Sequence, residues 1–368
     1  MKTNHERRQQ YFAMNSALSQ IDNSHLYTLL QPLEVHTKWG QHQTLDIEGT
    51  TVFVKRLPVT SIEFEHMFAT KNLYDLPTYY NYGFGSAGFS VWRELLANIK
   101  TTNWVLQGEI DYFPLLYHYR VIPVQEQRDP SEHRGMSPEE HANYVAYWGG
   151  HENIGQYMTD RANAEHELLL FMEYIPQMVR SLLMDNLDRM SYFLGQTIAV
   201  HDFLRKQGII HLDAHMANML TDGERIYLTD FGLVLDKKFP LSEDELQFFD
   251  RHTHYAYGHV ISNMVFFAAE KYDALPEPDK QLIQERYGLQ ADSQFDQIVF
   301  TLLKHIEDIH ARSLLALHQD YVDCMVQYRN VIMIMGTFYV GMEHSLQKDI
   351  QFPNEDVKQM LYEVGVAV

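Results

Sequence analysis

The chain has 368 residues, of which 45% are hydrophobic and 13% aromatic, so it is long and apolar enough to bury a sizeable core. Its 29 basic and 49 acidic residues give a net charge of −20, which argues against general binding to nucleic acid or to an anionic membrane surface. Cys324 is the single cysteine, which excludes an internal disulfide and removes any need for an oxidising compartment.

Residues 1–24 are expected to form an N-terminal helical extension. The first ten residues are polar and charged, without the apolar segment that a secretory signal carries. The expected location is therefore the cytoplasm.

Alternating residues predict strands over 34–39 and 44–47, followed by a turn at 48–50 and a third strand over 51–57. Lys55 lies within the third strand. A lone lysine on a strand is usually a solvated edge residue, so the alternation by itself assigns Lys55 no role.

Helical spacing predicts a helix over 89–99 that carries Glu94. A second, shorter helix is compatible with 61–71, where Glu63 and Glu65 lie closer to the lysine strand in sequence. If Lys55 has an acidic partner, Glu63 and Glu65 are alternatives to Glu94.

The segment Gly83–Gly88 has the pattern G-x-G-x-x-G and precedes the predicted helix. A dinucleotide-binding fold would require a strand before this pattern and an acidic residue about twenty positions after it, within a βαβ unit. Glu109 is available as the acidic residue, but no parallel-sheet alternation follows. The remaining interpretations are an anion site at the helix N-terminus and a simple turn into the helix.

A strand over 112–122 is followed by an insertion over 124–164, within which Ser137–Glu140 has the pattern of a capped helix start. The insertion is compatible with a substrate cap, a partner surface or a buttress, and a buttress is favoured. An apolar strand over 166–173 then leads to Ile175 and Pro176.

A helix predicted over 187–206 delivers the chain to the most informative segment, 210–232. Asp213 and Asn218 are five positions apart, and Asp230 begins an Asp-Phe-Gly turn. Phosphoryl transfer needs a group that accepts the proton of the attacking hydroxyl and oxygen ligands for Mg²⁺. These three side chains match both needs, and a hairpin predicted at Thr221–Glu224 would bring the two metal ligands together.

The patterns H-x-D-x-H-x-x-N and D-F-G resemble those of the protein-kinase-like superfamily, and are more similar to the aminoglycoside and choline phosphotransferase branch than to regulated protein kinases. The resemblance implies an α+β, bilobal protein-kinase-like fold. Its N-lobe would span 25–175, with an antiparallel sheet, one main helix and the insertion 124–164. Its mostly helical C-lobe would span 176–368 and carry both motifs.

The resemblance also implies roles for individual residues, with ATP and Mg²⁺ as cofactors. The implied catalytic residues are Asp213, His211 and His215, and the implied metal ligands are Asn218 and Asp230. The residues implied in ATP binding are Lys55, Glu94 (with Glu63 and Glu65 as rivals), Gly40, Met172, the Glu173 carbonyl and the Ile175 amide.

Several departures from the kinase pattern bear on the phosphate acceptor. The loop over 38–43 has a single glycine, and Leu212 replaces the arginine of His-Arg-Asp. No Ala-Pro-Glu follows D-F-G; instead Ser242–Glu245 has the pattern of a capping box that begins a helix. The sequence therefore favours transfer of the γ-phosphate to the hydroxyl of a small molecule. An atypical Ser/Thr protein kinase and a nucleotide-binding pseudokinase scaffold are the alternatives.

The remainder of the chain is predicted to be mostly helical, with an apolar stretch over 331–342 that is too short to span a bilayer. His252, His254 and His259 are compatible with a metal cluster, but their spacing and aromatic neighbours favour packing. The expected partners are ATP and a hydroxyl-bearing acceptor, without nucleic acid or membrane, and the oligomeric state is left open.

Overall fold

The computed structural model describes residues 3–30, 41–125 and 136–367. These residues form an α+β fold that contains more helix than strand, with antiparallel strand pairs. The strand predicted over 34–39 and Gly40 lie outside the described residues, as does part of the insertion. The chain divides into two compact units, one made of Met1–Pro176 with Tyr227–Gln247 and the other of Gln177–Ile226 with Phe248–Val368.

The first unit contains the main sheet, whose strand order within the described residues is β1-β2-β4-β3. The bounds of the strands are β1 Gln41–Ile47, β2 Thr50–Val59, β3 Leu116–Pro123, β4 His166–Glu173 and β9 Val234–Asp236. The bounds of the helices are α1 Asn4–Gln20, α2 Asn23–Leu29, α3 Ser61–Glu65, η1 Thr78–Asn81, α4 Val91–Gln107, α5 Pro138–Tyr147, α6 Glu152–Ala162 and η4 Phe231–Leu233. Strand β8 (Ile226–Leu228) and helix α9 (Glu243–Asp250) begin and end this unit's second segment.

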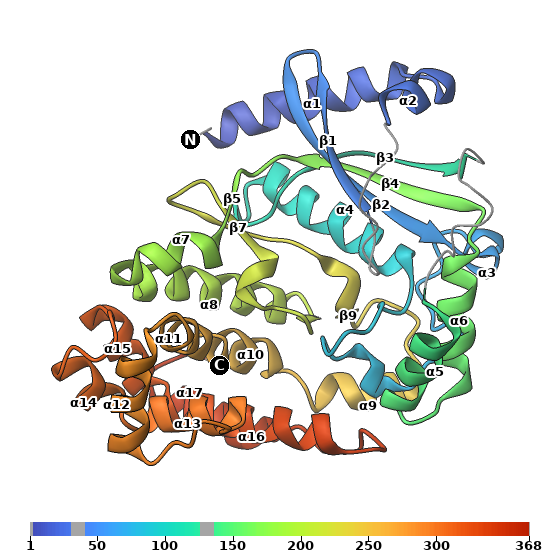
Figure 1. Cartoon of the computed structure of the whole chain (residues 1–368). Helices are drawn as coiled ribbons and strands as arrows, with labels where there is room; N and C mark the ends of the chain where they lie inside the picture. The colour runs from blue at the N-terminus through green and yellow to red at the C-terminus, as the bar shows by residue number, and fades with distance from the viewer. Residues whose placement is uncertain (1–2, 31–40, 126–135, 368) are drawn as a thin grey trace. The chain divides into compact units, whose positions relative to one another are not determined.

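Strand β4 is buried on both faces, which explains its continuous apolar sequence. Leu168, Leu170 and Met172 pack with residues of α4 in one hydrophobic cluster. The alternate residues point to the other face, where the side chain of Glu173 meets α1. Figure 1 shows α1 and α4 on opposite sides of the sheet. The last two residues of β4 are thus held by different helices.

Helix α4 begins and ends where its sequence provides caps. The Ser90 side chain accepts the Trp92 N–H at the start, and Gly108 in the left-handed conformation (φ 81°) ends the helix. The helix ends at Gln107, beyond the predicted end at residue 99, because the apolar stripe continues through Val105. Trp92 and Leu95 on this stripe are fully buried.

The second unit is mostly helical. Its strands are β5 Gln177–Met178, β6 Ile209–His211 and β7 Met219–Thr221. Its helices are α7 Val179–Asp185, η2 Leu187–Arg189, α8 Met190–Lys206, η3 Met216–Asn218, α10 Tyr255–Ser262, α11 Val265–Asp273, α12 Glu277–Tyr287, α13 Phe295–Lys304, α14 Ile306–Ala311, α15 Gln319–Gln327, α16 Arg329–His344 and α17 Asn354–Glu363. The apolar stretch 331–342 is the interior of α16, whose buried face packs against α10.

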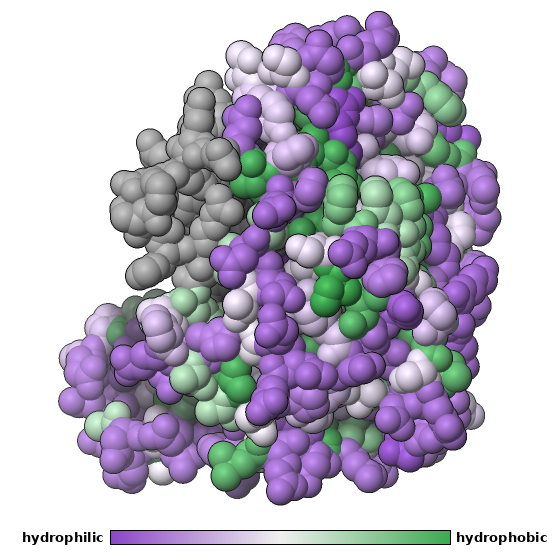
Figure 2. Space-filling view, turned by 90° about the vertical axis from the view of Figure 1, so that its right-hand side faces the viewer, coloured by the Kyte–Doolittle hydropathy of each residue, from purple (hydrophilic) through white to green (hydrophobic). Residues whose placement is uncertain are grey.

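Within the described part of the chain, no helix combines the length and apolar character needed to cross a bilayer. The face of the molecule in Figure 2 is covered mainly by hydrophilic residues, with small apolar patches between them.

The units and the predicted lobes are divided at different residues, and the first unit also contains residues 1–24, which were predicted to form a separate N-terminal extension. The boundary after Pro176 lies one residue beyond the predicted end of the N-lobe at 175, but residues 227–247, predicted to belong to the C-lobe, group with the first unit. The physical reason is a set of ion pairs between this segment and β2 or α4. The pairs are Lys55–Asp230, Arg93–Glu245 and Lys100–Asp236.

Candidate functional site

Lys55, Glu94 and Asp230 form one charged cluster in the first unit. The Lys55 Nζ donates to Glu94 Oε1 at 2.6 Å and to Asp230 Oδ1 at 2.8 Å. Lys55 lies on β2, which has β1 on one side and β4 on the other, so it is not the edge residue that a lone strand lysine usually is. The predicted pairing of Lys55 with Glu94 is observed.

The electrostatics of the cluster keep the lysine charged. Burial alone would lower the pKa of Lys55, but the negative charges of Asp230 and Glu94 outweigh it and raise that pKa above its ordinary value. The Glu94 side chain is 6% exposed, whereas that of Asp230 is 43% exposed. Glu94 therefore serves as the inner partner of the lysine, and Asp230 presents its carboxylate outward.

The two rivals of Glu94 have other positions. Glu63 is buried at the start of α3, where its carboxylate accepts the Thr60 N–H in a capping box and the Val91 N–H at 3.0 Å. Glu65 is exposed. Glu63 thus ties α3 to α4 and leaves the lysine to Glu94.

Asp230 adopts the left-handed conformation (φ 61°, ψ 71°), and its side chain accepts the Gly232 N–H. Few residues other than glycine adopt this conformation, and holding one there costs about 1–3 kcal/mol. The surrounding contacts, including the ion pair with Lys55, maintain this strained turn. Such strain is typical of functional sites.

The Gly83–Gly88 turn packs directly against the Asp-Phe-Gly turn. Gly88 has a φ of 80°, and a Cβ built on it would lie 2.5 Å from the Gly232 carbonyl oxygen. The amides of Val91, Trp92 and Arg93, the first three of α4, donate to Glu63, the Ser90 hydroxyl and the Ser90 carbonyl. The turn therefore acts as a close backbone contact, and these bonded amides do not favour the anion-site interpretation.

The described part of the insertion holds this turn in place. Tyr144 on α5 has its hydroxyl 2.7 Å from the Tyr80 hydroxyl and donates to the Gly85 carbonyl at 2.9 Å. Tyr80 in turn accepts the Ala87 N–H. Trp148 is fully buried in the same aromatic cluster. Through these contacts the insertion supports the turn that leads into α4, which is the role of a buttress.

Of the residues implied in ATP binding, Met172 and Glu173 end β4, and Ile175 follows two residues later. All three are buried. The Glu173 N–H donates to the Leu115 carbonyl at 2.8 Å, which fixes the backbone at the end of the strand. Gly40 cannot be placed, because it lies outside the described residues.

Arg7 is a buried charged residue that no motif indicates. It is fully buried, and its guanidinium forms an ion pair with Glu173 at 2.7 Å. The one sequence signal is its spacing with Met14 and Leu18, which places all three on the buried face of α1. Arginine on an otherwise apolar helical stripe would have suggested a buried ionic partner.

The loop that carries Asp213, His215 and Asn218 lies in the second unit, between β6 and β7, and is called the catalytic loop here because the resemblance implies catalysis by its residues. The Asn218 side-chain amide donates to the Asp213 carboxylate and to its carbonyl, both at 3.0 Å. Because its nitrogen faces Asp213, the amide oxygen of Asn218 is the atom that would ligate a metal. Leu212 and Ala214 are fully buried and anchor the loop on either side of Asp213.

The two histidines of the motif hold the loop through its backbone. His211 is buried, and its Nδ1 accepts the Asp213 N–H. The His215 Nδ1 accepts the Asn218 N–H, and the His215 Nε2 lies 3.6 Å from Asp213 Oδ1. His211 therefore positions the backbone of the loop, whereas His215 also faces the Asp213 carboxylate.

Two further histidines, His201 on α8 and His259 on α10, lie beside the motif histidines. Burial holds the pKa of each at about 3, with smaller contributions from neighbouring imidazoles. Both rings are thus neutral at ordinary pH, and they place an uncharged layer behind the catalytic loop.

His252 and His254, which were considered with His259 as a metal cluster, are packed against other side chains. His252 stacks on Phe248 with ring centroids 3.7 Å apart, and His254 contacts Asn354. Among the residues that the structure describes, no group of three or more His, Cys, Asp or Glu side chains is arranged to hold a metal ion.

The donors expected for Mg²⁺ have suitable chemistry, since a carboxylate and an amide oxygen are the hard ligands that this ion prefers, with water and phosphate as the others. The 43% exposure of Asp230 leaves its carboxylate accessible to such a cation.

No model of a known protein family matches the chain.

Proposed function

We propose that this protein is an ATP-dependent phosphotransferase that moves the γ-phosphate to a hydroxyl group of a small molecule. The observation that carries the proposal is the Lys55–Glu94–Asp230 cluster, in which a buried glutamate holds a charged lysine beside an outward-facing aspartate. A lysine held in this way suits the α- and β-phosphates of a nucleotide, and the aspartate suits a bound metal.

Each residue has a role that follows from its position. Lys55 would neutralise phosphate charge, and Glu94 would hold its ammonium in place. Asp230 and Asn218 would ligate Mg²⁺, which when bound supplies the charge that stabilises the phosphates during transfer. Asp213 would accept the proton of the attacking hydroxyl.

The geometry of the catalytic loop supports the role of Asp213. Its carboxylate accepts from Asn218 and faces His215 Nε2, so it is held in one orientation before any substrate binds. A proton taken from the acceptor would then reside on Asp213, with the His215 ring beside it. No covalent intermediate with the protein is needed.

A small acceptor is favoured over a protein by the segment that follows Asp-Phe-Gly. Strand β9 ends at Asp236 and α9 already begins at Glu243. The short connection is anchored by the buried Arg93–Glu245 pair and by the capping box between Ser242 and Glu245. A connection of this kind lacks the length of a peptide-binding activation segment.

Calorimetric titration with ATP, with and without Mg²⁺, tests the nucleotide site. Wild type is expected to bind ATP in a metal-dependent manner, Asp230→Asn to lose the metal dependence, and Lys55→Met to bind at least about tenfold more weakly. Lys71→Met, which removes an exposed lysine of the same unit, serves as the control. A wild-type protein that binds no nucleotide would contradict the proposal.

Turnover then separates the three candidate functions. Phosphate transfer to a small alcohol that is lost in Asp213→Asn would support the proposal. Incorporation into protein, lost in the same variant, would favour an atypical protein kinase. Nucleotide binding without turnover on either class would favour a pseudokinase scaffold.

A further inference from the structure

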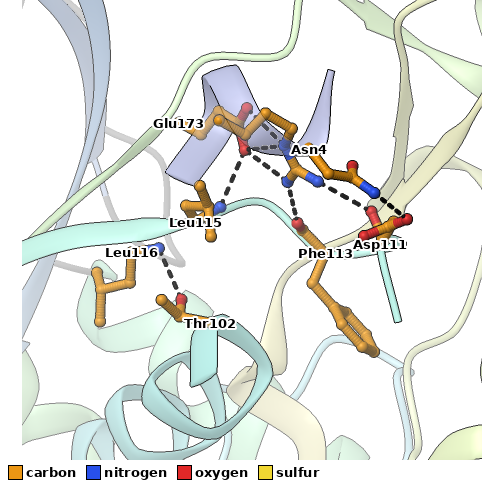
Figure 3. Close-up of polar contacts among 8 residues, drawn as sticks. Asn4, Thr102, Asp111, Phe113, Leu115, Leu116 and Glu173 are labelled. Atoms are coloured by element: carbon orange, nitrogen blue, oxygen red, sulfur yellow. Dashed lines mark hydrogen bonds and ion pairs between the residues drawn. The ribbon is translucent and has the colours of Figure 1, made fainter. Parts of the chain in front are cut away.

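The buried guanidinium of Arg7 binds three separate groups in the first unit. Its Nε and Nη2 donate to the Glu173 carboxylate at 3.0 and 2.7 Å, Nη2 donates to the Phe113 carbonyl at 2.6 Å, and Nη1 donates to the Asp111 carbonyl at 3.2 Å. Figure 3 shows Glu173, Phe113 and Asp111 close to one another, with Asn4 bonded to the Asp111 carboxylate. The first turn of α1 is thus tied by polar contacts to the end of β4 and to the segment that precedes β3.

These contacts fix the end of β4 from both sides. The Glu173 carboxylate, while bound to Arg7, also accepts the Leu115 N–H at 3.2 Å, and the Glu173 N–H donates to the Leu115 carbonyl. The side chain and the backbone of Glu173 are therefore both held. Arg7 completes this arrangement by holding Asp111 and Phe113, the residues that lead into β3.

Arginine is the residue that this position requires. Burying a carboxylate such as Glu173 (5% exposed) is costly unless it is paired and hydrogen-bonded. A guanidinium supplies a planar set of donors that reaches the carboxylate and two carbonyls at once, which a lysine ammonium cannot do with the same geometry. The requirement is therefore for the shape of the group as well as its charge.

We propose that Arg7 is a positioning residue for the base of the bound nucleotide, acting through Glu173. The inference rests on the proposed function, together with the contact of the Glu173 carbonyl and the Ile175 amide with the adenine edge that the family resemblance implies. Arg7 sets the position of that backbone and neutralises the Glu173 carboxylate. The helix α1 thereby becomes a part of the nucleotide site, rather than an extension outside the catalytic fold.

The phosphate side of the site does not depend on Arg7, because Lys55 holds Asp230 directly. Loss of Arg7 is therefore expected to affect recognition of the base and to leave binding of the metal–phosphate group intact. A general loss of folding would affect both, so the two effects can be separated by the choice of ligand.

The test compares MgATP with Mg-tripolyphosphate, which lacks the nucleoside, by calorimetry on wild type, Arg7→Met and Arg7→Lys. The lysine variant retains the charge, so the Glu173 carboxylate is not left buried alone. Both variants are expected to bind MgATP about tenfold more weakly, as a displaced contact group would cause, and Mg-tripolyphosphate within about twofold of wild type. Arg8→Met is the matched control, because Arg8 lies on the same helix and its Nη2 contacts the Val105 carbonyl of α4 instead.

The outcomes distinguish the two proposals. Unchanged MgATP affinity in both Arg7 variants, or an equal loss for both ligands, would overturn the role of Arg7 while leaving the proposed function standing. Failure of wild type to bind either ligand would overturn both. An Arg8→Met variant with the same selective loss of MgATP affinity would also count against Arg7, since the effect would then belong to α1 as a whole.

Discussion

Gly88 lies against Gly232 so closely that a Cβ on Gly88 would come within 2.5 Å of the Gly232 carbonyl oxygen. The contact joins the turn before α4 to the Asp-Phe-Gly turn, and neither backbone can move away without disturbing the cluster of Lys55, Glu94 and Asp230. It gives the second half of the G-x-G-x-x-G pattern a physical explanation that involves no ligand.

Gly88→Ala is expected to destabilise the protein by about 2–4 kcal/mol, because the new methyl group meets rigid backbone and the left-handed φ of 80° becomes unfavourable. The measurement is urea denaturation. Gly49→Ala is the control, since Gly49 has nearly the same φ (79°) but a Cβ added to it would meet nothing within 4 Å, so it is expected to lose only about 1 kcal/mol. Equal losses in the two variants would show that the close contact is absent.

The buried pair of Arg93 and Glu245, each 1% exposed, anchors α9 to α4. Arg93→Met leaves the Glu245 carboxylate buried without its ionic partner and is expected to cost about 3–5 kcal/mol. The double variant Arg93→Met with Glu245→Gln removes both charges and is expected to recover part of that loss. Denaturation midpoints measure the stability of the three variants. A double variant whose loss of stability exceeds the summed losses of the two single variants would contradict this account.

The Tyr144 hydroxyl is the polar link between the insertion and the Gly83–Gly88 turn. Tyr144→Phe removes its bonds to Tyr80 and to the Gly85 carbonyl and is expected to cost about 1–2 kcal/mol. Tyr362→Phe, at a side chain that is 71% exposed, is the control and is expected to be neutral within about 0.5 kcal/mol. If the Tyr144 change were equally neutral, the insertion would not buttress the turn through this contact.

The neutral histidines behind the catalytic loop predict a dependence of stability on pH. The pKa of His201 and His259 is about 3 in the folded chain and 6.5 in the unfolded reference. Between these values the unfolded chain binds more protons, so the free energy of unfolding falls as the pH decreases from 6.5 towards 3. The loss amounts to at most about 1.4 kcal/mol per pH unit for each histidine.

Replacing one of these histidines tests the origin of that dependence. Neither ring nitrogen of His201 has a hydrogen-bond partner among the described residues, so His201→Phe removes a titrating group without breaking a bond. The variant is expected to show a slope of stability against pH that is shallower by about 1 kcal/mol per unit between pH 6 and 4. Denaturation series at several pH values give the slope, and an unchanged slope would mean that His201 is not buried as a neutral ring.

The parts of the fold that sequence could predict are those fixed by local geometry. The lysine strand, the strand ending at Glu173, the helix that carries Glu94 and the two capping boxes are each specified within a few residues, by alternation, helical spacing or caps. The H-x-D-x-H-x-x-N segment is likewise specified locally, because Asp213, His215 and Asn218 bond to one another inside a single loop.

Only the tertiary structure decided the contacts between distant segments. Glu63 and Glu94 were both available to Lys55 from sequence, and the choice depended on which helix packs against the sheet at that depth. Arg7 and Glu173 are 166 residues apart, and no local pattern specifies such a pair. A buried charge is stable only where other segments supply its partners, so the position of Arg7, like the approach of Gly88 to Gly232, follows from the packing of the whole unit.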